Sequence, residues 1–195
     1  MTLMQRRRAL MGGRGSGILW SLDAPVAHSG KATYMSTFNL FDHNEDWTVF
    51  VNLDCTNRDC VPIFNTVTTP PTGVFNDNII STVLADGGLC VSKGRHGGIY
   101  GTYCVLNSSK YSFSSSTYPW TYTGNIKICV VHSANSKQMD FFVKYTNVNY
   151  VKKSLTYTTY PTGTYNMGAY FSGKLNELTV YKGAKSEAEC VAMIS

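Results

Sequence analysis

Residues 170–195 read YFSGKLNELTVYKGAKSEAECVAMIS, and this stretch decides the fold class. Ser172 and Gly173 predict a glycine turn, after which residues 174–181 form a strand that ends on an aromatic side chain. A short helix is predicted to open at Ser186, because Ser186 and Glu189 have the spacing of a capping box. In that motif the hydroxyl accepts the Glu189 N–H and the carboxylate accepts the Ser186 N–H. An apolar run completes this helix start: Cys190, Val191, Met193 and Ile194.

Strand patterns also dominate the chain before this stretch. Residues 47–54, 126–130 and 139–145 alternate apolar and polar side chains with a period of two. The turn SANSK at 133–137 joins the last two runs into a hairpin, and Asp86-Gly87 indicates another. Further strands are predicted near residues 33–41, 98–106, 149–157, 165–170 and 174–181. Many short antiparallel strands with one terminal helix indicate an all-β sandwich or barrel.

Three segments carry a resemblance to a known fold family. They are KATYMSTFNLFDHNEDWTVFVNLD at 31–54, GNIKICVVHSANSKQMDFFVKYTN at 124–147 and YNMGAYFSGKLNELTVYKGAKSEAE at 165–189. They resemble the opening strands, the central hairpin, and the last two strands and helix of laminin-G-like, concanavalin A-like lectin and glucanase domains. The resemblance covers residues 31–195 with gaps. It implies an antiparallel jelly-roll β-sandwich with a short C-terminal helix, and it implies little about the ligand.

The N-terminus differs in composition from the rest of the chain. Most of the net charge of +5 comes from four arginines that precede or interrupt the glycine-rich run GGRGSG: Arg6, Arg7, Arg8 and Arg14. We therefore expect residues 1–17 to form a basic, glycine-rich arm and residues 18–195 to form one sandwich domain. Without the arm the body is nearly neutral, which argues against a broad nucleic-acid footprint.

The N-terminal sequence also predicts where the protein is made and located. The apolar segment after Arg8 is shorter than the roughly seven to fifteen residues of a signal-peptide core, so no signal peptide is expected. No window approaches the roughly twenty apolar residues of a membrane span. RRRALMGG resembles the openings of proteins encoded in phage and prophage structural regions. That resemblance implies a virion protein made in the host cytoplasm.

The cysteine and histidine positions assign neither a disulfide nor a metal site. Cys55 and Cys60 flank a polar loop, and Cys90 and Cys104 lie on successive runs where they are candidates to face each other. Without an export signal, buried free thiols are favoured over disulfides for the six cysteines. The four histidines are scattered and no C-x-x-C pair exists, so no metal site is assigned. No cofactor is expected, although calcium stays open because several laminin-G-like modules bind it at the sandwich rim.

Enzymatic chemistry is not expected. Concanavalin A-like hydrolases that resemble the laminarinase group carry Glu-x-Asp-x-x-Glu on one strand, and retaining chemistry needs two carboxyls about 5 Å apart. This chain has no such triplet. Glu45 and Asp46 are neighbours in a turn, Glu187 and Glu189 belong to the helix cap, and no G-x-S-x-G nucleophile motif is present.

A candidate ligand-binding segment is YSFSSSTYPWTY at 111–122, where aromatic side chains are interleaved with hydroxyls. Flat aromatic faces beside hydroxyl and amide groups hold sugar rings and partner surfaces. We predict that Tyr118, Trp120 and Tyr122 bind the ligand. The loop KGRHGG at 93–98 is expected to be a hairpin turn that brings His96 to the same rim. The alternative is that Trp120 and its neighbours plug the edge of the sandwich.

These observations predict a non-enzymatic binding or adhesion module, a lectin-like head on a phage tail, fibre or capsid appendage. Its partners would be a glycan or host-surface receptor, other virion proteins through the arm, and further copies of itself in a homo-oligomer. Two alternatives stay open: a virion decoration protein that makes only protein–protein contacts, and a cellular carbohydrate-binding module.

Deletion of residues 1–17 tests the division into arm and sandwich. The arm carries charge and glycine but little core-forming material, so the melting temperature is expected to stay unchanged while assembly onto the partner is lost. Calorimetry of the truncated and full chains makes the comparison. A large fall in melting temperature would mean that the arm packs into the core.

Overall fold

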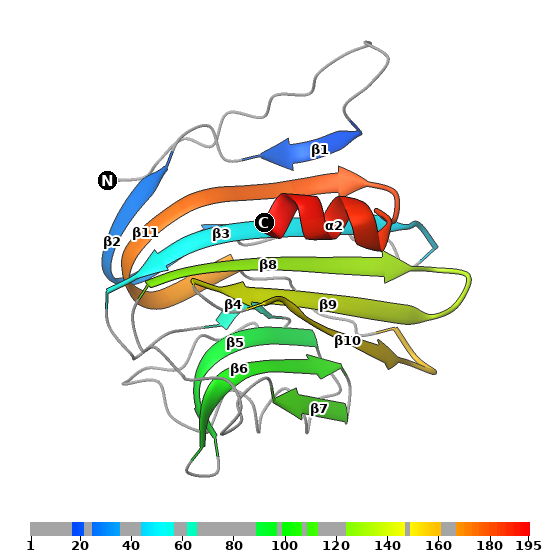
Figure 1. The fold of residues 1–195 in the computed structure, drawn as a ribbon, viewed down its shortest axis with the longest axis horizontal. Coiled ribbons are helices and arrows are strands. Elements are labelled where there is room, and N and C mark those ends of the chain that lie inside the picture. The colour runs from blue at the N-terminus through cyan, green and yellow to red at the C-terminus, as the bar shows by residue number, and fades with distance from the viewer. Residues whose placement is uncertain are drawn as a thin grey trace.

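The part of the chain that the structure describes folds into an antiparallel β-sandwich with a short C-terminal helix (Figure 1). The computed structural model describes residues 17–21, 25–35, 44–56, 62–65, 89–96, 99–106, 109–112, 124–146, 149–160 and 167–195. The strands are β1 (Ile18–Ser21), β2 (Val26–Met35), β3 (Trp47–Cys55), β4 (Pro62–Asn65), β5 (Leu89–His96), β6 (Ile99–Leu106), β7 (Ser109–Ser112), β8 (Gly124–Ser133), β9 (Gln138–Tyr145), β10 (Val151–Thr156) and β11 (Met167–Lys182). Helix α2 (Glu187–Ile194) follows the last strand.

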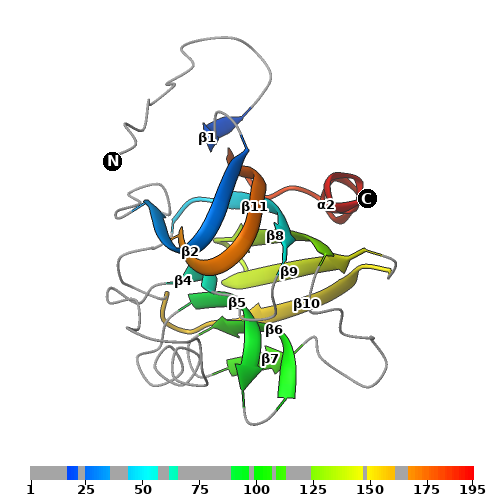
Figure 2. The same cartoon turned by 90° about the vertical axis from the view of Figure 1, so that its left-hand side faces the viewer.

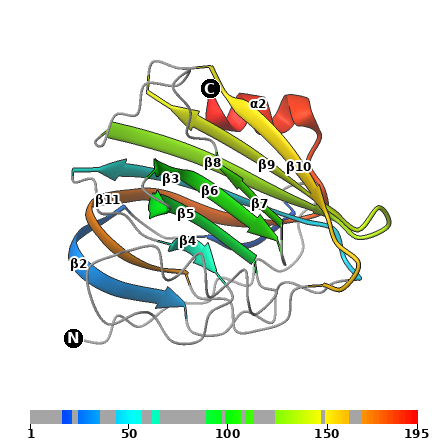
Figure 3. The same ribbon diagram turned by 90° about the horizontal axis from the view of Figure 1, so that it is seen from below.

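Two sheets make up the sandwich. A seven-stranded sheet has the order β1-β11-β3-β8-β9-β10, with β2 also paired to β11, and a four-stranded sheet has the order β4-β5-β6-β7. The larger sheet arches, with the smaller sheet beneath it and α2 outside (Figure 2). Seen from below, β5, β6 and β7 lie in front of the larger sheet (Figure 3). The sequence-based prediction of an all-β, antiparallel sandwich with a short C-terminal helix is confirmed.

The central strands of the larger sheet are buried on both faces. Register places Val49 beside Val130 and Val180, and Val51 beside Ile128, on the face away from the helix. On the opposite face, Phe50, Cys129, Val131 and Phe142 form a buried cluster with Cys190 and Ile194 of α2. Helix α2 covers the face of β8 that period-two alternation would expose to solvent. The residues in the middle of β8 are therefore almost all buried.

One predicted turn is wrong. Ser172 and Gly173 do not reverse the chain: they lie inside β11, which runs unbroken over 16 residues. Gly173 has a φ of 148°, and the register shifts between Leu175 and Glu177. Glycine and the bulge therefore bend one strand, instead of separating two. The bend lets the first part of β11 pair with β2 and the second part with β3.

Other local predictions have mixed outcomes. The hairpin at 133–137 is confirmed, with Lys137 at a φ of 50° and its N–H donating to Ala134 O. Cys90 and Cys104 are not cross-strand partners, because register pairs Cys90 with Val105 and Cys104 with Val91. The predicted arm up to residue 16, the Asp86-Gly87 hairpin and Cys60 lie outside the described residues. No helix in the described part is long and apolar enough to cross a membrane.

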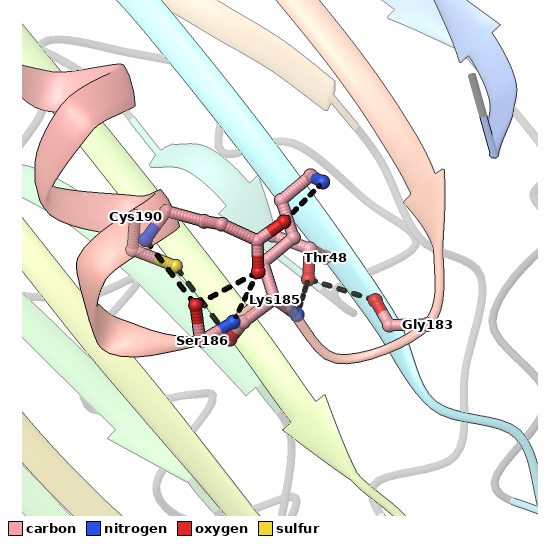
Figure 4. Close-up of polar contacts among 6 residues, drawn as sticks. Thr48, Gly183, Lys185, Ser186 and Cys190 are labelled. Atoms are coloured by element: carbon pink, nitrogen blue, oxygen red, sulfur yellow. Dashed lines mark hydrogen bonds and ion pairs between the residues drawn. The ribbon is translucent and has the colours of Figure 1, made fainter. Parts of the chain in front are cut away.

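Helix α2 begins as predicted. Ser186 is the N-cap, its hydroxyl accepts the Glu189 N–H, and the Glu189 carboxylate accepts the Ser186 N–H at 2.8 Å (Figure 4). These bonds lower the pKa of Glu189. The turn before the helix is fixed by Thr48, a fully buried residue of β3. Its hydroxyl donates to Gly183 O at 2.9 Å and accepts the Lys185 N–H at 3.0 Å.

Ser186→Ala removes the acceptor of the Glu189 N–H and is expected to cost about 1 kcal/mol of unfolding free energy. Ser186→Thr is the matched control, because threonine keeps the hydroxyl. Denaturant unfolding of both variants gives the comparison. If the alanine variant is as stable as wild type, the cap contributes nothing to the fold.

Candidate functional site

The predicted aromatic segment links the two sheets. Tyr118, Trp120 and Tyr122 lie in residues 113–123, which are outside the described residues. The strand before them, β7, ends at Ser112 in the smaller sheet, where it pairs with Tyr103. The strand after them, β8, begins at Gly124 in the larger sheet. The chain therefore passes from one sheet to the other within this segment, and its role as a binding surface stays a prediction.

His96 lies at the end of β5, where its backbone pairs with Ile99 of β6. The predicted hairpin is confirmed by this pairing, but Lys93–His96 belong to β5 instead of a loop, and residues 97–98 lie outside the described residues. Since β7 is antiparallel to β6, it runs in the same direction as β5, toward this hairpin. Ser112 is level with Tyr103, so the aromatic segment leaves β7 roughly 13 Å short of the hairpin end, at about 3.3 Å per residue.

A polar cluster lies at the other anchor of the segment. Asn52 and Asp54 of β3, Asn125 of β8 and Asn176 of β11 come from adjacent strands. Asn125 Nδ2 donates to Asp54 Oδ1 at 2.8 Å and to Asn52 Oδ1 at 2.7 Å, and Asn176 Nδ2 donates to Asp54 Oδ2 at 2.8 Å. All four side chains are partly exposed. We call these four residues the amide cluster.

The charge of Asp54 is stabilised by its neighbours. The hydrogen bonds from Asn176 and then Asn125, with a smaller contribution from Lys174, lower the pKa of the Asp54 carboxyl. The same bonds fix the orientation of the amide groups, which leaves a rigid arrangement of donors and acceptors at the sheet surface. Because Asn125 directly follows Gly124, the amide cluster lies where the aromatic segment rejoins the sheet.

A second group of interacting side chains, centred on His132, was not predicted from the sequence. The fully buried His132 of β8 stacks on Trp47 at a centroid distance of 5.1 Å and contacts Tyr160 edge-on at 5.2 Å. Its Nδ1 lies 2.9 Å from Glu45 O, so Nδ1 carries the proton, and Nε2 accepts the Tyr157 hydroxyl at 2.6 Å. Both ring nitrogens are thus used inside the protein. The period-two alternation along β8 places His132 on the inner face of the sheet, and this alternation could have predicted its burial from the sequence.

The carboxylates of the described part mostly bind other groups of the protein. Asp46 Oδ1 accepts the Ala134 N–H at 2.8 Å. Glu187 and Asp140 both bind Lys152 Nζ, at 2.8 and 3.5 Å, and the Lys152 bond is the main cause of the lowered pKa of Glu187. Within the described residues no group of three or more histidine, cysteine, aspartate and glutamate side chains is arranged to hold a metal ion.

Comparison with solved structures places this sandwich among known folds. It is similar to the CBM40 domain of the Ruminococcus gnavus IT-sialidase bound to α2,6-sialyllactose, with a TM-score of 0.57 and 12% identity over 92% of this chain and 100% of that one. It is also similar to the winged bean acidic lectin complexed with methyl-α-D-galactose, with a TM-score of 0.50 and 11% identity over 80% of each chain. The fold is the concanavalin A-like jelly roll.

A third solved structure is similar at a comparably low sequence identity. The Bauhinia forficata lectin in complex with GalNAc gives a TM-score of 0.51 and 11% identity over 87% of this chain and 97% of that one. At these identities the likeness establishes the fold, so the jelly-roll prediction is confirmed. No protein-family model matches the sequence, and no curated protein matches it.

The pKa of Asp54 tests the amide cluster directly. An NMR titration of its carboxyl is expected to give a value below 3.8, and Asn176→Ala should move it upward because a hydrogen bond to the charged form is lost. A carboxyl with a lowered folded-state pKa adds stability at higher pH and loses it as pH falls through that pKa. The cluster's contribution should therefore begin to decline as pH falls to about 4 and be lost only below the lowered pKa of Asp54. An identical pKa in wild type and Asn176→Ala would contradict the assigned bonds.

Proposed function

We propose that this chain is a non-enzymatic, lectin-like module that binds glycans. The observation that carries the proposal is the shared jelly roll, which spans 92% of this chain and all of a CBM40 domain solved with α2,6-sialyllactose. Lectins solved with methyl-α-D-galactose and with GalNAc share it as well. A fold alone does not assign a function, so the proposal also rests on the residues at the two ends of one segment.

The proposed binding surface is the aromatic segment with the groups at its anchors. Tyr118, Trp120 and Tyr122 would stack on sugar rings, since aromatic faces suit the apolar faces of a pyranose. His96 lies at the hairpin toward which β7 runs. The amide cluster lies where the segment rejoins the larger sheet, and its fixed amide groups offer the hydrogen bonds that sugar hydroxyls need.

A purely binding role fits the carboxylates. Glycosidase chemistry requires a pair of carboxyls on either side of the scissile bond. In the described residues, Asp54 is bound by amides, and Glu187 and Asp140 share a lysine. A calcium ion at the rim is compatible with the proposal, but it is assigned no ligands.

The proposal also includes the biological setting of the module, which is a virion. A virion protein that displays this module in several copies would gain avidity, because each added site binds at a raised effective concentration. Its support is the RRRALMGG opening and the basic arm. Native mass spectrometry separates the settings: a trimer or higher oligomer favours the virion, and a monomer favours a cellular carbohydrate-binding module.

A glycan array with the full chain tests the function itself. Sialylated, galactose-terminated and GalNAc-terminated glycans are the probes, and reproducible binding to at least one class is expected. The signal should persist after salt is raised, because stacking and neutral hydrogen bonds are only weakly screened. Absence of binding to every glycan would favour the alternative of a decoration protein that makes only protein contacts.

Trp120→Ala then tests the aromatic surface. If Trp120 is an exposed platform, glycan binding should be lost while the unfolding free energy changes by less than about 1 kcal/mol. A buried aromatic plug would instead lose roughly 3–5 kcal/mol on truncation. Tyr150→Ala is the control: Tyr150 is an exposed aromatic beside β10, bonded to Glu187, and its loss should leave binding intact. Loss of stability in Trp120→Ala would remove the binding-site assignment.

A further inference from the structure

Two buried cysteines meet between the terminal helix and the larger sheet. Cys129 lies in the middle of β8 on the helix-facing side, and Cys190 lies in the first turn of α2. Both are fully buried, and both are thiols. They belong to one apolar cluster with Phe50, Val131 and Ile194. The chain segment between the two cysteines is about sixty residues long, so the cluster joins distant parts of the sequence.

The Cys190 thiol is hydrogen-bonded to the turn before the helix. Cys190 donates to Lys185 O at 3.9 Å, within the turn that precedes the helix (Figure 4). Cys129 lies in the same buried cluster, where the two thiols interact. This interaction raises the pKa of Cys129, with burial adding to the effect, and it lowers the pKa of Cys190. Cys190 is therefore the better nucleophile of the pair.

We propose that Cys129 and Cys190 are a redox-modification site that closes to a disulfide bond when the protein meets a small-molecule disulfide. The enclosure of both thiols in one buried cluster between two packed elements carries the inference. The helix is anchored through Thr48 and Ser186, so the pair is held in register.

The reaction balances with oxidised glutathione as the oxidant. The Cys190 thiolate attacks one glutathione sulfur, the S–S bond of glutathione breaks, and one glutathione leaves as a thiol. Cys129 then loses its proton and attacks the Cys190 sulfur, which expels the second glutathione. The two protein thiols lose two electrons, and one small disulfide becomes two thiols that carry the two protons.

Access to the thiols requires the helix to move. Both sulfurs are enclosed when α2 is packed, so attack by Cys190 must follow a local opening of this short element. A weaker helix cap should raise the population of the open state. The disulfide would then hold the helix on the sheet and remove entropy from the unfolded chain.

The experiment oxidises the full chain with oxidised glutathione, blocks remaining thiols with iodoacetamide and maps the peptides by mass spectrometry. We expect one peptide pair to join Cys129 to Cys190. The melting temperature should rise by about 5–15 °C and return to its starting value with dithiothreitol. Cys129→Ala and Cys190→Ala are the controls, and oxidation should leave their melting temperatures unchanged. Peptide mapping of wild type decides the question even if a control variant folds poorly.

Two results would overturn the proposal. The first is recovery of Cys129 and Cys190 as separate alkylated peptides when the oxidised protein is unfolded in iodoacetamide. The second concerns the route: Ser186→Ala should speed formation of the bond about fivefold, if cap loss is worth about 1 kcal/mol of helix opening. Equal rates in Ser186→Ala and wild type would contradict access through α2.

Discussion

Burial of the larger sheet on both faces is the constraint on which the rest of the structure depends. One face of β3, β8 and β9 packs toward the smaller sheet, and the other would expose Phe50, Val131 and Phe142 to water without α2. Burying each such side chain fully contributes about 1.5–3 kcal/mol. The helix must therefore sit at one place on the sheet. Thr48 fixes that place, because one buried hydroxyl binds both Gly183 and Lys185 in the turn before the helix.

The length of α2 also decides where the outer face stays polar. The helix ends at Ile194, and Lys127 of β8 donates to the carbonyl of Ser195 directly after it. Register places Lys127 opposite Asn52, the first residue of the amide cluster. The apolar half of the face thus lies under the helix, and the uncovered half carries hydrogen-bonding groups. In the proposed function, this uncovered half is the surface that meets the sugar beside the aromatic segment.

Sequence reasoning succeeded where the signal was local. The capping box of Ser186 and Glu189 lies within four residues, and the hairpin at 133–137 is closed by a bond from Lys137 to Ala134. Alternation predicted β3, β8 and β9, because period two is a property of the strand itself.

What the sequence did not reveal depends on contacts between distant residues. From the sequence alone, Gly173 predicts a turn. Its place inside one bent strand is set by the pairing of β11 with both β2 and β3. The bond from Tyr157 to His132 and the buried cluster shared by Cys129 and Cys190 arise only when strands and helix are assembled. The amide cluster draws on adjacent strands whose order is not written in the sequence. Tyr118, Trp120 and Tyr122 remain predictions.

Amide chemical-shift mapping by NMR tests the central claim most directly, namely that the end of the sandwich beside the amide cluster binds sugar. α2,3-Sialyllactose, α2,6-sialyllactose, methyl-α-D-galactose and GalNAc would each be titrated into the labelled chain. The account predicts saturable shifts with at least one of them, concentrated in residues 113–125 and at Asn176, with α2 unaffected. Saturable shifts confined to other surfaces, or no shifts with any of the four sugars, would contradict it.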